Sequence, residues 1–132
     1  MMADKTIQDV DIDRECNRAV EGERVWVLLT HIKPDRRQEF EHFIHDFIAP
    51  ISARSEPNVL NRTRFLLPAE PNEDGTYTYV FLMDPVVKDG IYSFEKILSL
   101  DYSPEETAVH LKLWNDSLAS PQVGYEVIQA NW

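Results

Sequence analysis

The hydrophobic residues along the chain change their spacing several times, and each spacing predicts a secondary-structure element. Residues 25–32 form a continuous run of apolar and β-branched residues, which is typical of a strand. Apolar residues at helical spacing follow, and on a wheel of about 100° per residue they form one narrow stripe. The stripe consists of Phe40, Phe43, Ile44, Phe47 and Ile51. It predicts a helix over residues 35–52, with Pro34 suited to the first turn.

Two further predicted strands flank a turn-forming region in the middle of the chain. Residues 58–68 and 76–84 are rich in β-branched, aromatic and other apolar side chains. Residues 69–75 lie between them and end in Asp74 and Gly75, a pair that favours tight turns. This part of the chain therefore predicts an antiparallel hairpin.

The last part of the chain predicts a short helix, a long helix and a final strand. Residues 91–98 have the apolar spacing of a short helix. Residues 103–106 read Ser-Pro-Glu-Glu, a capping-box sequence that marks the start of a helix continuing to about Ala119. Residues 122–130 then have the composition of a strand.

The polar, acidic residues 1–22 precede this pattern. Ile12, Cys16, Ala19 and Val20 fall at helical spacing, and Gly22 is suited to end a helix. We expect residues 1–22 to form a short helix or a partly disordered segment, and residues 23–132 to form one domain.

The order of the main elements is strand, helix, strand, strand, helix, strand, with one extra short helix before the last long one. This order is the ferredoxin-like pattern. Right-handed crossovers would give one four-stranded antiparallel sheet with its helices on a single face. The expected fold class is therefore α+β, ferredoxin-like.

The predicted strands are apolar on both faces, which bears on assembly. In the first strand Val25, Val27 and Leu29 share one face, while Trp26 and Leu28 share the other. Two helices cover only one face of a sheet, and monomers rarely expose a large apolar face. We therefore expect a homodimer paired through the sheet. The alternative is that the N-terminal segment and the extra helix cover the second face within one chain.

Composition narrows the classes of partner. The 132 residues contain 13 Lys plus Arg and 23 Asp plus Glu, which gives a net charge of -10. Such a charge repels nucleic acids and anionic membranes. The single cysteine excludes an intramolecular disulfide. The first residues of the given sequence lack the apolar region of a signal peptide. No apolar run is long enough to span a membrane. We expect a cytoplasmic protein.

The order of elements over residues 24–130, together with His31-Ile32-Lys33-Pro34 before a Phe-rich helix, resembles the dimeric α/β-barrel superfamily. That superfamily includes antibiotic-biosynthesis-monooxygenase-like proteins. The resemblance implies two ferredoxin-like subunits that pair face to face, each with a cleft between sheet and helices. Members include cofactor-independent oxygenases, isomerases and haem-degrading enzymes. The resemblance implies that haem-degrading members use an asparagine on the first strand, a tryptophan near the third and a histidine ligand on the second main helix. Here only His110 is placed to mimic that histidine, because the first strand has no asparagine and the third no tryptophan. Haem degradation is therefore not expected, and no cofactor is predicted.

Three of the four histidines lie close together in the sequence, which raises the question of a metal site. On the helical wheel, His42 and His45 point away from the apolar stripe, among acidic neighbours. A catalytic metal site needs three converging ligands, so we predict none here. His31 shares strand parity with Val27 and Leu29 at the end of the strand, where it could line the mouth of a cleft or bond locally.

The last long helix carries a group of residues typical of a ligand pocket. The wheel places Asn115 inside the apolar stripe, with Trp114 and His110 at its border. A pocket is mostly apolar with a few polar groups, and these three residues fit that composition. Alternatively, Asn115 bonds to backbone, Trp114 belongs to the core and His110 is solvated.

Arginine and tyrosine residues on the predicted hairpin are the remaining candidates. Arg62 and Arg64 could pair with acidic residues, or they could bind a carboxylate or enolate, because a guanidinium binds such groups with two hydrogen bonds. Tyr77 and Tyr79 could donate phenolic hydrogen bonds in the same cleft. The sequence has no Gly-rich phosphate loop and no GxSxG motif.

The hypothesis from sequence is a homodimer with a cleft for a small, partly aromatic or acidic molecule. If it is an enzyme, cofactor-independent oxygenation or isomerisation is favoured. Arg64 would hold an anionic oxygen, His110 would exchange a proton, and Trp114 and Tyr79 would shape the pocket. Asn115, His31 and Arg62 would contribute further ligand contacts. The alternative is a non-catalytic dimer that binds a metabolite or another protein.

Overall fold

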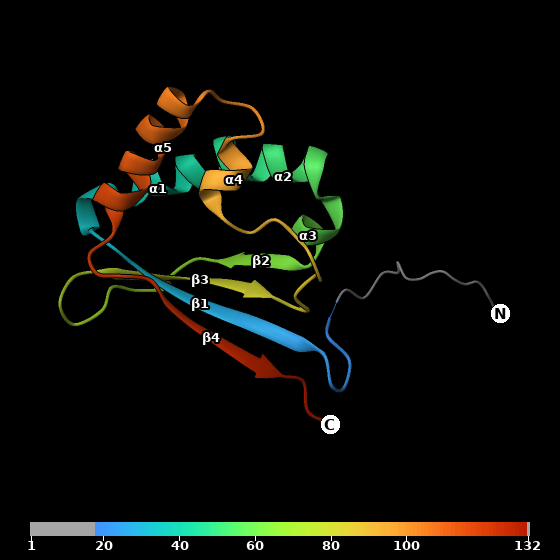
Figure 1. The fold of residues 1–132 in the computed structure, drawn as a ribbon. Helices are drawn as coiled ribbons and strands as arrows, with labels where there is room; N and C mark the ends of the chain where they lie inside the picture. Colours follow the sequence, from blue (N-terminus) through green and yellow to red (C-terminus); the bar gives the residue numbers. More distant parts are fainter. Residues whose placement is uncertain (1–17, 132) are drawn as a thin grey trace.

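The four strands form one antiparallel sheet in the order β2-β3-β1-β4 (Figure 1). The computed structural model describes residues 18–131. The strands are β1 (Arg24–Ile32), β2 (Thr63–Leu66), β3 (Tyr77–Met83) and β4 (Val123–Ile128). The first and third strands occupy the centre of the sheet. This confirms the predicted ferredoxin-like α+β fold.

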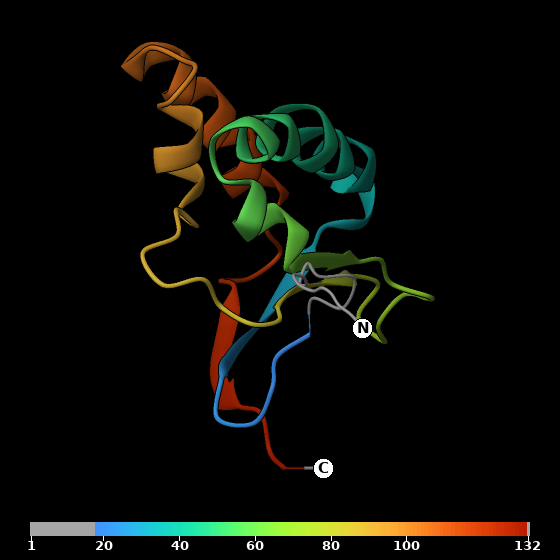
Figure 2. The same ribbon diagram turned by 90° about the vertical axis from the view of Figure 1, so that its right-hand side faces the viewer.

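All helices of the described chain lie on one face of the sheet (Figures 1 and 2). The connection from β1 to β2 contains η2 (Pro34–Arg36), α1 (Arg37–His42), η3 (Phe43–Ile48), α2 (Ala49–Ser55) and α3 (Pro57–Asn61). The connection from β3 to β4 contains α4 (Phe94–Leu98) and α5 (Pro104–Ser117). None of the helices in residues 18–131 is both long and apolar enough to cross a bilayer.

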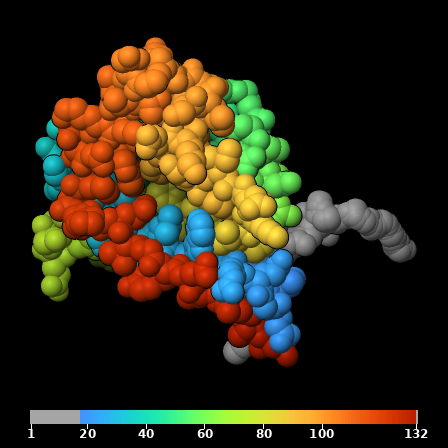
Figure 3. Space-filling model, in the orientation of Figure 1, coloured from blue at the N-terminus to red at the C-terminus, as the bar shows by residue number. Residues whose placement is uncertain are grey.

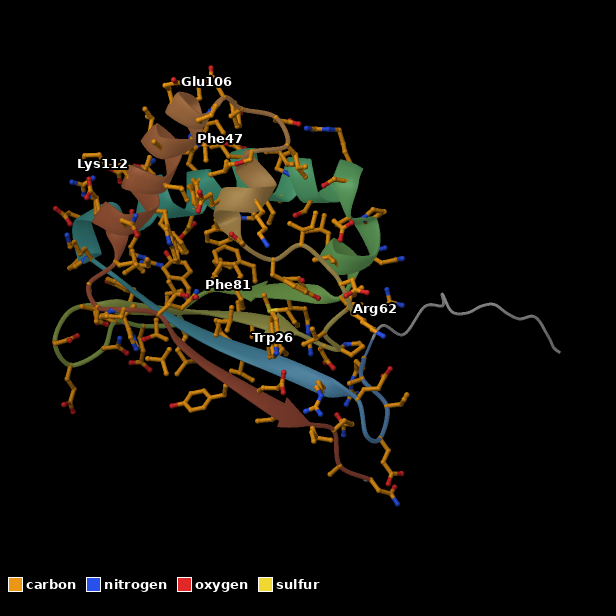
Figure 4. All side chains as sticks on the ribbon, viewed as in Figure 1. Trp26, Phe47, Arg62, Phe81, Glu106 and Lys112 are labelled. Carbon is orange, nitrogen blue, oxygen red and sulfur yellow. The ribbon has the colours of Figure 1, made fainter. Side chains whose placement is uncertain are left out.

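The register of β1 and β3 decides which side chains face the helices. Leu28 pairs with Phe81 and Thr30 pairs with Tyr79, so these four residues lie on the helix-covered face. Figure 4 shows Phe81 pointing from the sheet toward the helices. The buried cluster formed with the helices contains Ile32, Phe40, Phe43, Ile44, Ile48, Ile51, Tyr79, Phe81, Met83, Ile97 and Leu98. Apolar burial of this kind is the main force that holds the two layers together.

The predicted first helix forms, but it is not one regular α-helix. A 3-10 turn precedes α1, and Phe43–Ile48 is a π-helical stretch between α1 and α2. Phe40 and Phe43 are fully buried, as the stripe predicts. A π-helical stretch changes the angle between successive side chains, so residues after Phe43 no longer follow the α-helical wheel.

The predicted second strand is wrong in its first part. Residues 57–61 form the short helix α3, and the strand covers only Thr63–Leu66. Pro57 favours the first position of a helix, where a missing N–H costs nothing. Val59 is buried, and its carbonyl accepts a 2.7 Å hydrogen bond from Thr63 Oγ1 that joins α3 to β2.

The capping box at the start of α5 is confirmed. Glu106 N donates to Ser103 Oγ at 3.1 Å, and Ser103 N donates to Glu106 Oε1 at 3.0 Å. These two bonds satisfy backbone N–H groups that otherwise have no partner in the first turn.

The short helix predicted around Ile12 and Cys16 lies largely outside the described residues. Residues 18–22 are not helical. The backbone N–H of Ala19, which is buried, donates to Asp84 Oδ1 at 2.7 Å and fastens this segment to the end of β3.

Candidate functional site

A partly enclosed cavity of about 240 Å³ lies between the helices and the β2–β3 half of the sheet. Its walls come from η3, α2, α3, α4, the loop before α4, β2 and β3. They consist of Ile44, His45, Ile48, Ala49, Ser52, Val59, Leu60, Thr63, Phe65, Phe81, Met83, Ile91, Tyr92, Phe94 and Ile97. The cavity exists because the phenyl rings rising from the sheet and the branched side chains of the helices leave this volume unfilled.

The cavity lining is almost entirely apolar. Within residues 18–131 it includes no Asp, Glu, Lys or Arg. The Thr63 hydroxyl donates a hydrogen bond to the carbonyl of Val59, and the Tyr92 hydroxyl accepts a 2.8 Å hydrogen bond from Val87 N. Burial raises the pKa of the Tyr92 phenol above its ordinary value. The cavity therefore suits an uncharged, apolar molecule.

His45 lies at the mouth of this cavity. Its side chain is exposed, as predicted, and its ring packs edge to face on Phe65 with 5.7 Å between the centroids. The helical wheel predicts that His45 faces solvent and lies away from any site. It lines the cavity because the π-helical stretch Phe43–Ile48 carries it toward β2. A π-helical stretch is frequent at functional sites, but the spacing of apolar residues in the sequence does not predict where it occurs.

A second cavity of about 200 Å³ adjoins the first. The two share Phe81, Met83, Tyr92 and Phe94 in their walls. The second cavity continues toward Leu28, Trp114 and Gln122, and Figure 3 shows it as a hollow between α5 and the yellow segment that contains α4. Trp114 thus lines a cavity, as predicted, at a ring-centroid distance of 4.8 Å from Phe94.

The other two residues predicted on α5 do not join Trp114. His110 packs within the helix layer, with ring centroids 4.4 Å from Phe47 and 4.8 Å from Tyr102. Asn115 is exposed, so its predicted place in the buried stripe is wrong. The buried face of α5 is centred near Trp114, because the helix is rotated relative to the stripe drawn from its apolar residues.

Tyr79 is fully buried on the helix-covered face but lines neither cavity. Its hydroxyl accepts a 3.0 Å hydrogen bond from Arg37 Nε and donates one of 2.5 Å to Glu41 Oε2. Burial and the bond to Glu41 raise the pKa of Tyr79 to about 12. The phenol therefore connects β3 to α1 rather than facing a ligand.

His31 and Arg64 lie on the side of the sheet without helices. His31 Nδ1 is 2.8 Å from Thr78 Oγ1, and the pocket that it lines is polar and separate from the apolar cavity. Arg64 Nη2 donates to Asp84 Oδ2 at 2.8 Å, as expected from the alternative in which the arginines pair with acidic residues. Arg62 lies at the end of α3 and lines a surface depression rather than the apolar cavity.

The predicted site residues are therefore distributed over several places. Trp114 lines a cavity, His110 and Tyr79 belong to the packing of the helix layer, and His31 and Arg64 face the other side of the sheet. The residues that sequence reasoning missed are the cavity walls from α2 and α3 and the histidine at its mouth. Within residues 18–131, no three His, Cys, Asp or Glu side chains are grouped to hold a metal ion.

Two solved structures are similar to this chain. A Caulobacter crescentus CB15 protein, provisionally assigned as an antibiotic biosynthesis monooxygenase, is 16% identical, with a TM-score of 0.47, over 84% of this chain and 92% of its own. Rv0793 from Mycobacterium tuberculosis is 15% identical, with a TM-score of 0.41, over 83% of this chain and 96% of its own.

No protein-family model matches the chain, and no curated protein is significantly similar to it. At such low identity no residue role is transferred from either structure.

Proposed function

We propose that this protein binds a small, apolar and partly aromatic molecule between its sheet and its helices. The observation that carries the proposal is the cavity of about 240 Å³ walled by Phe65, Phe81 and Phe94. An empty apolar cavity lowers stability, because its lining loses packing contacts. A ligand that fills it regains those contacts, and aromatic walls favour a flat ring that stacks on them or meets their edges.

The polarity of the lining favours an aromatic ligand over an acidic one. The two arginines predicted to hold an anionic oxygen lie outside this cavity, and its walls supply no other cation within the described chain. A polar group of the ligand would therefore be placed at the mouth, next to His45, where water also reaches it. This suits a phenol or ketone with one polar end.

If the protein is an enzyme, cofactor-independent oxygenation or isomerisation of such a ligand is the proposed chemistry. His45 is favoured for the proton exchange that was expected of His110, because it lies at the cavity mouth while His110 is packed on Phe47 and Tyr102. An imidazole suits this role because its ordinary pKa lies near neutrality. The alternative is a binding protein without catalysis, for a metabolite or another protein.

We further propose that the protein is a cytoplasmic homodimer paired through the uncovered face of the sheet. On β4, the side chains of Val123, Tyr125 and Val127 are 38%, 55% and 47% exposed. They continue the apolar face of Val27 and Leu29, with which β4 pairs in register. A second copy of this chain would bury that face symmetrically. The single cysteine supports the cytoplasmic location.

The binding proposal is tested by filling the cavity. Ala49 lines it and is partly buried, so Ala49→Phe should occupy much of the volume. Ala53 lies one turn further along α2 and is exposed, so Ala53→Phe is the matched control. Thermal unfolding is measured with 1-naphthol, 2-naphthoate and cyclohexanol as probes.

We expect 1-naphthol to raise the melting temperature of the wild type and of Ala53→Phe, because a ligand stabilises the folded state by mass action. The anion 2-naphthoate should raise it less, because the cavity walls supply no cation for its carboxylate. Ala49→Phe should show no such rise. An equal rise in Ala49→Phe would place binding elsewhere and contradict the proposal. For the enzymatic alternative, oxygen consumption with a bound phenol should fall in His45→Gln and not in His42→Gln.

A further inference from the structure

A cluster of arginines lies at the junction of α3, β2 and the end of β3. Arg18, Asn61, Arg62, Arg64 and Asp84 line a surface depression of about 210 Å³. Three guanidinium groups and one carboxylate thus meet in one place. The whole chain has a net charge of -10, so guanidinium groups that share one depression are a distinctive feature of its surface.

The carboxylate of Asp84 is already satisfied and fixes one wall of the depression. Its Oδ1 accepts from Ala19 N at 2.7 Å, and its Oδ2 accepts from Arg64 Nη2 at 2.8 Å. The Asp84 side chain is 12% exposed while that of Arg64 is 53% exposed. Because a guanidinium has five N–H donors, Arg64 is held in place through one edge and presents the rest to the depression.

Arg62 contributes a charge that no carboxylate of residues 18–131 neutralises in a direct ion pair. Its Nη1 donates to the carbonyl oxygen of Asn58 at 3.3 Å, across the last turn of α3. That bond orients the guanidinium without cancelling its charge. Figure 4 shows Arg62 at the end of α3, at the surface of the molecule.

We propose that Arg62 and Arg64 bind an oxyanion, the phosphate or carboxylate group of a small molecule, with Arg18 at the rim. Two oriented guanidinium groups offer paired N–H donors that match the oxygens of such a group. The nearby carboxylate of Asp84 is paired with Arg64, and each of its oxygens already accepts one hydrogen bond. The site stands apart from the apolar cavity: Val59, Leu60 and Thr63 of the same segment face that cavity, whereas Asn61, Arg62 and Arg64 line the depression.

The proposal is tested by nuclear magnetic resonance on the full chain, with the Nε–H signals of the arginines as the readout. Sodium phosphate and sodium acetate are titrated in separate arms, against sodium chloride at equal ionic strength. Saturable shifts at Arg62 and Arg64 with either oxyanion support the site, and the lower dissociation constant identifies the preferred group. Shifts that are linear, or equal to those with chloride, would overturn it.

Substitutions separate this site from general charge effects. Arg62→Gln should weaken binding about tenfold or more, because a hydrogen bond to a charged group is lost. Arg24→Gln is the matched control, because Arg24 is 60% exposed and paired with Glu126 at 3.0 Å outside the depression. It should leave binding unchanged. A wild-type dissociation constant in Arg62→Gln would refute the assignment, and Arg64→Gln repeats the test provided that it remains folded.

Discussion

Thr107 has a buried hydroxyl without a hydrogen-bond partner among the described residues. It lies on the inner face of α5 and is 3% exposed. A buried hydroxyl that makes no hydrogen bond has lost its water without compensation. Thr107→Val keeps the shape of the side chain and removes that cost, so it should raise the free energy of unfolding by about 1 kcal/mol. Urea denaturation measures the change.

The neighbouring cap gives the contrast for this substitution. Ser103→Ala removes the hydroxyl that accepts from Glu106 N, and it should lower the free energy of unfolding by about 1 kcal/mol. A loss of stability in Thr107→Val as well would mean that the Thr107 hydroxyl is satisfied, which contradicts the prediction.

His45 illustrates what single residues do and do not reveal. Its exposure follows from its acidic and polar neighbours in the sequence. Its position at the mouth of the cavity depends on the π-helical stretch and on the ring of Phe65, which is contributed by another element. Neither the position of His45 nor its contact with Phe65 can be predicted from regular periodicity, because the π-helical stretch interrupts the α-helical period.

At the scale of elements, the phenol of Tyr79 joins the sheet to the first helix. Arg37 and Glu41 lie one turn apart on α1, and both bond to the Tyr79 hydroxyl. Tyr79→Phe should lower stability at neutral pH by about 1–2 kcal/mol. The loss stays moderate because both partners remain accessible to water, with side chains 34% and 33% exposed.

The same contact makes stability depend on alkaline pH. Folding raises the pKa of Tyr79 from its ordinary value of 10.0 to about 12, so the folded chain holds the phenolic proton more tightly than the unfolded chain does. This contribution is fully present below pH 10 and is lost as the pH rises through about 12. The wild type should therefore lose more stability than Tyr79→Phe over this range. Urea midpoints at about pH 9 and about pH 11.5 give the comparison, and equal losses would contradict it.

The α3–β2 segment shows why some elements resist sequence interpretation. Residues 58–68 have the composition of a strand, but only Thr63–Leu66 pairs with β3. Val59 packs on the opposite loop so closely that a Cβ at Gly90 would lie 2.7 Å from its Cγ2. Tertiary packing therefore outweighs local propensity here, and it places Val59 in the cavity wall.

At the scale of the whole molecule, the uncovered face of the sheet should govern assembly. Light scattering should give a mass of about twice the 15.4 kDa of one chain. Tyr125→Asp introduces a charge on that face and should give monomers. Val109 is 70% exposed on α5, on the helix side, so Val109→Asp is the control and should remain dimeric. A wild-type monomer at micromolar concentration would contradict the dimer proposal.

The sequence by itself determined the order and type of most elements. The apolar run of β1, the stripe of the first helix and the capping box of α5 are local patterns, and each is confirmed. Their order is enough for the ferredoxin-like topology, because handedness and short connections leave few alternatives. The two apolar faces of β1 also follow from strand parity, because side chains alternate.

Only the tertiary structure decided which face the helices cover and where the cavity lies. The rotation of α5 exposes Asn115 and turns Trp114 inward, which the apolar residues of that helix do not specify. Arg64 and His110 have suitable chemistry, but the sheet separates them. Local periodicity sets the direction of a side chain relative to its own element. The meeting of side chains from different elements depends on register, helix rotation and packing, which come from contacts distant in sequence.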